Sequence, residues 1–187
     1  MHKKIVVLGS GEGSNFTAII SSGIIIDKVI TNNPKAGIIR RAETSQVPCA
    51  VVDPADQHGH GLGWIERRIL EEIPKDTDLI VLAGFMRILS PYFCEYWADK
   101  IINIHPSLLP AFAGTCKAIQ EAYDHGCKVF GVTIHWVTPE IDAGTIIAQR
   151  AIHKFDSDTL EDIIKKVRSV EHYLYSKEIK NLLGLVV

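Results

Sequence analysis

The sequence predicts an α/β protein with a single domain, built on an open, twisted, mostly parallel sheet with helices on both faces. Short apolar runs alternate with segments of helical periodicity over residues 4–105, as in parallel sheets that are covered on both sides. After residue 126, two longer apolar segments are separated only by a tight polar stretch, which predicts antiparallel strands near the C-terminal end. A length of 187 residues suits one domain over residues 1–187.

The first part of the chain should contain five parallel strands with helices between them. The apolar runs that we expect to form strands are residues 4–10, 24–30, 49–53, 78–84 and 100–105. The segments with helical spacing are residues 14–22, 35–46, 63–73 and 90–98. Ser14 or Asn15 can cap the first helix, and Ser90 followed by Pro91 is typical of a helix start.

The last part of the chain should close the sheet with two antiparallel strands, at residues 128–137 and 145–153. We assign residues 111–126 to a loop. Asp158 and Glu161 have the spacing of a capping box, so the last helix should run from about Asp158 to near Leu183.

Composition favours a globular protein without a general affinity for nucleic acid or membranes. The net charge is -2, from 20 basic and 22 acidic residues, which gives no general attraction to nucleic acid or to anionic membranes. No apolar stretch approaches the ~20 residues of a membrane span. The N-terminal apolar run ends after Leu8, too early for a signal peptide. We therefore expect a cytoplasmic protein with no nucleic-acid or membrane partner.

We expect no metal site. The four cysteines are scattered singly without a CxxC pair, so we expect free, mostly buried thiols at Cys49, Cys94, Cys116 and Cys127. His58 and His60 have the look of a metal-binding pair, but the glycines around them favour a loop.

The turn GSGEGSNF, residues 9–16, follows the first strand and opens the first helix. Backbone N–H groups that glycines leave accessible at a helix N-terminus can hold a phosphate. The spacing matches neither a dinucleotide fingerprint nor a Walker loop, and no acidic residue closes the second strand. The turn indicates an anion site of unspecified ligand, with a tight turn that binds nothing as the alternative.

Asn103 and His105 lie on the fifth strand and should point to the same face, with Ile104 opposite. Pro106 keeps His105 extended. Ligands of open α/β sheets bind at the carboxyl ends of the strands. An amide donor beside a histidine that can act as general acid or base indicates an active site, while a structural histidine remains the alternative.

Asp142 lies in the tight segment between the last two strands and is the third candidate. A carboxylate near His105 would favour the imidazolium form and orient the ring. Because no GxSxG motif surrounds Ser107, the attacking nucleophile should belong to the substrate. His135 competes with His105, as a core residue, a support for the site or part of its lining.

Four motifs carry a family resemblance. The segments LAGFMRILSP, NIHPSLLP and HWVTPEIDAGTII, in this order after GSGEGSNF, resemble the glycinamide ribonucleotide formyltransferases of purine biosynthesis, and the match spans nearly the whole chain. The resemblance implies a Rossmann-like formyltransferase fold over a single catalytic domain. It also implies transfer of a formyl group from the co-substrate 10-formyltetrahydrofolate to the amino group of 5'-phosphoribosylglycinamide, by a monomer or homodimer without a metal.

The resemblance also assigns roles to residues. The catalytic trio would be Asn103, His105 and Asp142. The ribonucleotide would contact Gly13, Ser14, Asn15 and Glu171. Besides Asn103 and Asp142, the folate pocket would be formed by Met86, Arg87, Ile88, Leu89, Thr138, Pro139, Glu140 and Ile141. On periodicity alone, Met86, Ile88 and Leu89 would be assigned to the core.

The chain departs from the family pattern in two places. Ala113 stands where the family usually has proline, and it lacks proline's fixed φ. Neither Arg67 nor Arg68 is a clear match for the basic residue that some members place near the folate tail.

Three other functions compete with this one. Methionyl-tRNA formyltransferases carry a further tRNA-binding domain, and formyltetrahydrofolate hydrolases carry an N-terminal regulatory domain, so the length of the chain favours neither. A folate- or nucleotide-binding protein without catalysis would have no need of the trio Asn103, His105 and Asp142.

Overall fold

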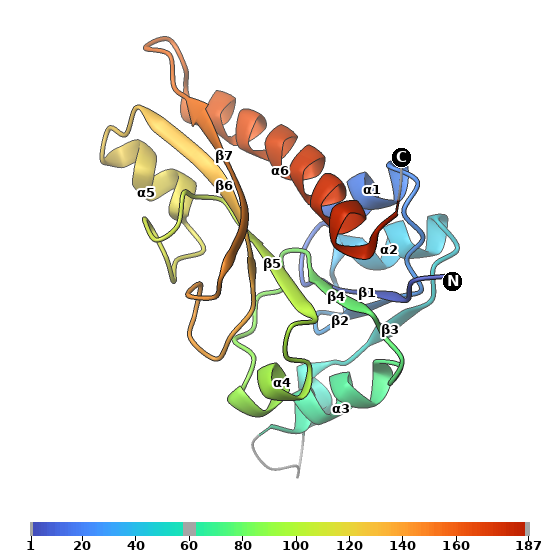
Figure 1. Ribbon diagram of the computed structural model, residues 1–187. Helices are drawn as coiled ribbons and strands as arrows, with labels where there is room; N and C mark the ends of the chain where they lie inside the picture. Colours follow the sequence, from blue (N-terminus) through green and yellow to red (C-terminus); the bar gives the residue numbers. More distant parts are fainter. Residues whose placement is uncertain (1, 58–62, 186–187) are drawn as a thin grey trace.

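The computed structural model describes residues 2–57 and 63–185, and its strands form one sheet in the order β3-β2-β1-β4-β5-β6-β7 (Figure 1). The parallel strands are β1 (Ile5–Leu8), β2 (Lys28–Thr31), β3 (Cys49–Val51), β4 (Leu79–Leu82) and β5 (Ile101–His105). Two longer strands, β6 (Val129–Trp136) and β7 (Ile146–His153), pair antiparallel beside β5. The predicted fold class is therefore confirmed.

Helices cover both faces of the sheet. One face packs against α1 (Ser14–Ser21), α2 (Gly37–Thr44), α5 (Ala118–Asp124) and the long α6 (Leu160–Leu183). The other face packs against α3 (Trp64–Glu72) and α4 (Pro91–Tyr96), which lie together at the opposite side of the sheet in Figure 1.

Strand β1 illustrates how the two cores arise from one apolar run. Ile5 and Val7 are buried on the α1 and α6 side, whereas Val6 and Leu8 are buried on the α3 and α4 side. Side chains alternate across a strand, so a central strand buried on both faces needs apolar residues at every position. The same rule applies to β5, where Ile101 is buried on the α3 and α4 side. Asn103 and His105 therefore lie on that side as well.

Several element boundaries differ from the predictions. Strand β2 begins only at Lys28. Just before it, the backbone N–H of Ile5 donates to the carboxylate of Asp27 at 2.8 Å, and not to a carbonyl of a neighbouring strand. The stretch assigned to a loop contains helix α5, and a short 3-10 helix covers Pro54–Gln57.

The helix caps were predicted correctly at one of three positions. Ser90 caps α4 by accepting from the backbone N–H of Phe93, with Pro91 at the first helical position. Helix α1 is instead preceded by Gly13 in a left-handed conformation, without a side-chain cap. Helix α6 has its capping box one residue later than predicted, at Thr159 and Asp162, because the Asp158 carboxylate is engaged by the N–H of Phe155.

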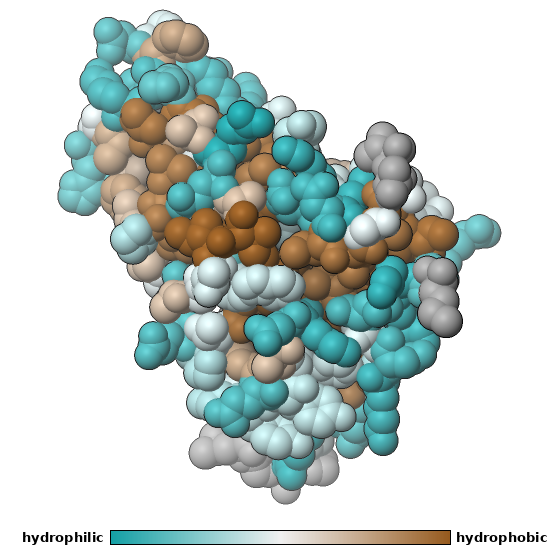
Figure 2. All heavy atoms as spheres, in the orientation of Figure 1, coloured by the Kyte–Doolittle hydropathy of each residue, from teal (hydrophilic) through white to brown (hydrophobic). Residues whose placement is uncertain are grey.

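Apolar residues on the face drawn in Figure 2 gather over β7 and toward the C-terminal end of α6, and hydrophilic residues surround them. Ile146 on β7 and Leu182 on α6 are exposed apolar residues. Among the described residues, no helix combines the length and the apolar character that crossing a bilayer requires.

Candidate active site

One cavity of about 560 Å³ opens at the carboxyl ends of β1, β4 and β5. Every residue that the sequence places in the site lines this cavity, from the glycine turn, the 86–89 segment, β5, the 138–142 segment and helix α6. This position agrees with the rule that open α/β sheets bind ligands beyond the carboxyl ends of their strands. Gly11 and Glu12 of the predicted glycine turn also line it. So do Thr115, Cys116 and Arg168, which we did not predict.

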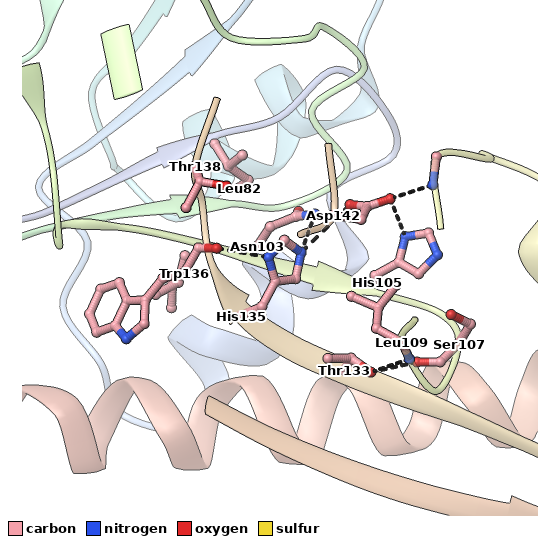
Figure 3. A network of polar contacts seen from close by, with 12 residues as sticks. Leu82, Asn103, His105, Ser107, Leu109, Thr133, His135, Trp136, Thr138 and Asp142 are labelled. Atoms are coloured by element: carbon pink, nitrogen blue, oxygen red, sulfur yellow. Dashed lines mark hydrogen bonds and ion pairs between the residues drawn. The ribbon is translucent and has the colours of Figure 1, made fainter. Parts of the chain in front are cut away.

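His105 lies between two groups that can only accept hydrogen bonds. Its Nε2 is 2.9 Å from the carbonyl oxygen of Phe112. Its Nδ1 is 3.4 Å from Oδ2 of Asp142, as Figure 3 shows. A neutral imidazole has only one N–H and can serve one of the two. Both ring nitrogens of His105 thus face acceptors, so the ring is placed to act as a hydrogen-bond donor, as a general acid or oxyanion donor requires.

Asp142 lies between two histidines. Its Oδ2 accepts from the backbone N–H of Gly114 at 2.8 Å, and its Oδ1 is 3.6 Å from Nε2 of His135. The pKa of Asp142 is lowered, chiefly by His135, with help from the Gly114 N–H and the charge of His105, while burial opposes the shift. The carboxylate is thus kept charged beside His105.

His135 was left open in the sequence analysis, and the structure brings it into the site. It pairs with Asn103 across strands β5 and β6, and its Nε2 is 3.3 Å from the Asn103 amide nitrogen (Figure 3). Its Nδ1 donates to the carbonyl of Trp136 at 2.9 Å, which holds the ring with Nε2 between the Asn103 amide and Oδ1 of Asp142. His135 therefore contacts two members of the predicted trio.

The turn around Asp142 depends on backbone conformation. Asp142 has φ 52°, in the left-handed region that aspartate tolerates better than most residues. A Cβ at Gly144 would overlap the carbonyl oxygen of Trp136, so only glycine lets this turn pack against the end of β6. The Asp-x-Gly motif therefore has a structural reason at both of its ends.

The glycine turn has the features of an anion site. Gly13 precedes α1 with φ 76°, and a Cβ there would press on Ile38. No acidic residue lies in the first turn of α1, and no side chain of the described residues caps it. Glu12 is the one acidic residue of the turn, and its carboxylate lies over Gly37 at the start of α2. The free N–H groups of α1 can thus serve an anion in the cavity.

Helix α6 brings Glu171 and Arg168 to the cavity, one turn apart on the same side. Burial raises the pKa of Glu171 to about 7, against the opposing effect of the Arg168 charge. One turn further, the hydroxyl of buried Tyr175 lies 2.9 Å from the carbonyl of Leu82 and 3.1 Å from that of Ile102. These contacts fix α6 against β4 and β5, directly beneath the strand ends that carry the site.

The 86–89 segment is only partly core. Leu89 is buried as periodicity alone predicts, but the side chains of Met86 and Ile88 are 68% and 71% exposed. Both line the cavity, as do Arg87 and Ile141. Exposed apolar side chains at a cavity wall are suited to a flat aromatic ligand.

Some sequence candidates lie elsewhere. Arg67 and Arg68 do not line the cavity, and Arg68 pairs with Glu71. His58 and His60 lie outside the described residues, and in the rest of the chain no group of three or more metal-ligating side chains occurs. The cysteines are free as predicted, but only Cys94 is buried. Cys49 and Cys127 are partly buried, and Cys116 is exposed at the cavity.

Comparisons with known proteins agree with this geometry. The sequence pattern of the formyl transferase family matches residues 3–179. The phosphoribosylglycinamide formyltransferase of Bacillus subtilis (strain 168) is 39% identical over 190 residues, which cover 98% of this chain and 96% of the relative. The enzyme of the same name from Escherichia coli (strain K12) is 36% identical, over 91% of this chain and 82% of its own.

A solved structure extends the likeness to three dimensions. The crystal structure of glycinamide ribonucleotide transformylase 1 from Geobacillus kaustophilus superposes with a TM-score of 0.91 at 36% identity. The superposition covers 98% of this chain and 100% of the other. The two proteins are therefore similar in both sequence and fold over nearly their whole length.

Proposed function

The chain belongs to the formyl transferase family, as its motifs predicted, and we propose that it transfers the formyl group of 10-formyltetrahydrofolate to the amino group of phosphoribosylglycinamide. The observation that carries the proposal is the position of Asn103, His105 and Asp142 in one cavity, between an anion-binding turn and exposed apolar walls. The reaction makes the chain an enzyme of purine biosynthesis.

The two substrates fit different parts of the cavity. The ribonucleotide phosphate would accept from the N–H groups at the start of α1, at Gly13, Ser14 and Asn15. Glu171 would contact the ribose hydroxyls. The folate ring would lie between Met86–Leu89 and Thr138–Asp142, and its formyl group would face Asn103. In this arrangement the amine of the ribonucleotide approaches the formyl carbon from the part of the cavity next to α1.

The mechanism needs no nucleophile from the protein. The substrate amine attacks the formyl carbon, the new C–N bond forms, and the carbonyl oxygen becomes an oxyanion. The amide of Asn103 and an N–H of His105 donate to this oxyanion, which is the largest contribution expected of such a site. The C–N10 bond then breaks, the amine loses its proton, and N10 of the folate gains one.

Asp142 supports this step in two ways. It keeps His105 in the charged form that donates, and it can accept the proton that the amine loses, directly or through water. The Nε2–H of His105 now donates to the carbonyl of Phe112, so the oxyanion would replace that acceptor if it binds at Nε2. The fixed contact with Asp142 would keep the ring oriented during the exchange.

A turnover assay tests the proposal. The protein is mixed with phosphoribosylglycinamide and 10-formyltetrahydrofolate, and the formation of tetrahydrofolate and of formylated ribonucleotide is followed in parallel. We expect equal amounts of both products. Release of formate with water as the only acceptor, or no turnover, would refute the proposal. A parallel assay of Asp142→Asn should show turnover lower by about 10²-fold or more.

A further inference from the structure

Ser10 lies directly after β1, buried beneath the cavity without lining it. Strand β1 has β2 on one side and β4 on the other. The backbone N–H of Ser10 donates to the carbonyl of Gly84, after β4, at 3.0 Å. Its carbonyl accepts from the side-chain amide of Asn33, after β2, at 3.0 Å. The residue thus joins the segments that leave three neighbouring strands.

The hydroxyl of Ser10 makes a directed pair of hydrogen bonds. It donates to Oδ1 of Asn32 at 2.6 Å and accepts from the backbone N–H of Met86 at 2.9 Å. The amide oxygen of Asn32 can only accept and the N–H of Met86 can only donate. The single hydroxyl proton therefore goes to Asn32, and a lone pair of the oxygen faces Met86.

These bonds connect the two walls of the cavity. Gly11–Asn15 follow Ser10 directly and form the anion-binding turn, and Met86 lies in the wall that faces the folate. Phe85 and Leu89 pack on the core at either end of this segment, but the side chains of Met86 and Ile88 are too exposed to anchor it by packing. A backbone hydrogen bond to a buried group is then a main constraint on the position of the wall at Met86.

We propose that Ser10 is a positioning residue for the formyl donor: its hydroxyl fixes the backbone at Met86 relative to the anion-binding turn. The distance between the folate wall and the ribonucleotide phosphate is thereby set before either substrate binds. The identity of the two ligands rests on the function proposed above, whereas the hydrogen bonds do not.

Steady-state kinetics of Ser10→Ala test the inference. The KM for 10-formyltetrahydrofolate should rise about two- to ten-fold, the range of one neutral hydrogen bond, with kcat and the KM for the ribonucleotide within about two-fold. Asn32→Ala should act in the same direction, since it frees the hydroxyl to rotate. The double variant should show less than the product of the two effects.

Ser176→Ala is the matched control. Ser176 is 6% exposed and Ser10 is 7% exposed, but the hydroxyl of Ser176 donates at 2.9 Å only to the carbonyl of His172 in its own helix. The control should leave all three kinetic constants within about two-fold. If Ser10→Ala does not fold, Asn32→Ala carries the comparison.

Amide hydrogen exchange gives a readout that is independent of turnover. Exchange at Met86 should be faster in Ser10→Ala than in the unchanged protein, and unaltered in Ser176→Ala. The dissociation constant for tetrahydrofolate, measured by calorimetry, should rise by the same factor as the KM of the formyl donor.

Two results would overturn the inference: unchanged exchange at Met86, or equal rises in the KM values of both substrates. If the unchanged protein fails to turn over, the proposed function fails. The exchange data then still decide whether Ser10 fixes the wall.

Discussion

His105 is buried and has a hydrogen-bond acceptor beside each of its two ring nitrogens. These acceptors are at Phe112 and at Asp142, and the two contacts orient the ring. Only the contact with Asp142 involves a charged partner, which makes the Phe112 contact the one a substrate can replace.

His105→Ala should therefore act on the transition state rather than on binding. We expect kcat to fall by about 10²- to 10⁴-fold, the range for one general acid or base, while the dissociation constants of both substrates change by less than about three-fold. Exposed His153 on β7 provides the control, and His153→Ala should keep full activity. A loss of binding as large as the loss of kcat would assign His105 a structural role.

Glu171 lies in surroundings that disfavour its charged form. Its pKa of about 7 is higher than the ordinary 4.5, because burial disfavours the carboxylate. The folded state therefore binds the proton more tightly than the unfolded chain. Its contribution to stability is most favourable below pH 4.5 and is lost as the pH rises through about 7.

Glu171→Gln should remove this pH dependence. At pH 8 the free energy of unfolding of the variant should exceed that of the unchanged protein by about 1–3 kcal/mol, less than the full shift implies because solvent screens a partly exposed group. At pH 4.5 the two should be equally stable. Urea unfolding at several pH values measures this, with exposed Glu43→Gln as the control. A difference that is the same at every pH would contradict the assignment.

At the scale of elements, the site depends on how the end of β6 meets the turn that follows it. The carbonyl of Trp136 accepts from Nδ1 of His135, and the backbone N–H of Trp136 donates to Thr145 at 3.0 Å. Gly144 packs against the same carbonyl with no space for a side chain. The positions of His135 and Asp142 are therefore linked through one peptide group.

Gly144→Ala should separate these two residues without touching either. The added methyl group has to displace the Trp136 carbonyl, so we expect a loss of about 1–3 kcal/mol in stability and about ten- to hundred-fold in kcat/KM. Thermal unfolding and steady-state kinetics measure the two effects. Ala143→Ser, at the exposed neighbouring position, should change neither by much. Full activity in Gly144→Ala would show that the turn tolerates a different path.

The elements also show what a sequence can predict of such a site. Alternation along β5 and the proline after it placed Asn103 and His105 on one face, since both effects are local. The partnership of Asn103 with His135 depends on the register between β5 and β6, which local rules do not determine. Helix α5 was missed because it is short and carries no side-chain cap to mark its start.

At the scale of the whole molecule, the cavity draws its walls from segments far apart in the chain. The turn after β1, the segment after β4, the ends of β5 and β6 and one side of α6 all contribute. Tyr175 connects α6 to β4 and β5 beneath them. A substrate that contacts several of these segments should therefore stabilise the fold as a whole.

Phosphoribosylglycinamide at a hundred times its dissociation constant should raise stability by about 2.7 kcal/mol, which corresponds to about 5–10 °C in Tm for a chain of this size. Scanning calorimetry measures the shift. Gly13→Ala should abolish it, because a Cβ at this position strains the anion-binding turn and presses on Ile38. His105→Ala should keep it, because a residue that acts on the transition state does not hold the ground state. Loss of the shift in both variants would mean that the two parts of the site form as one unit, and that His105 supports the cavity as well as the reaction.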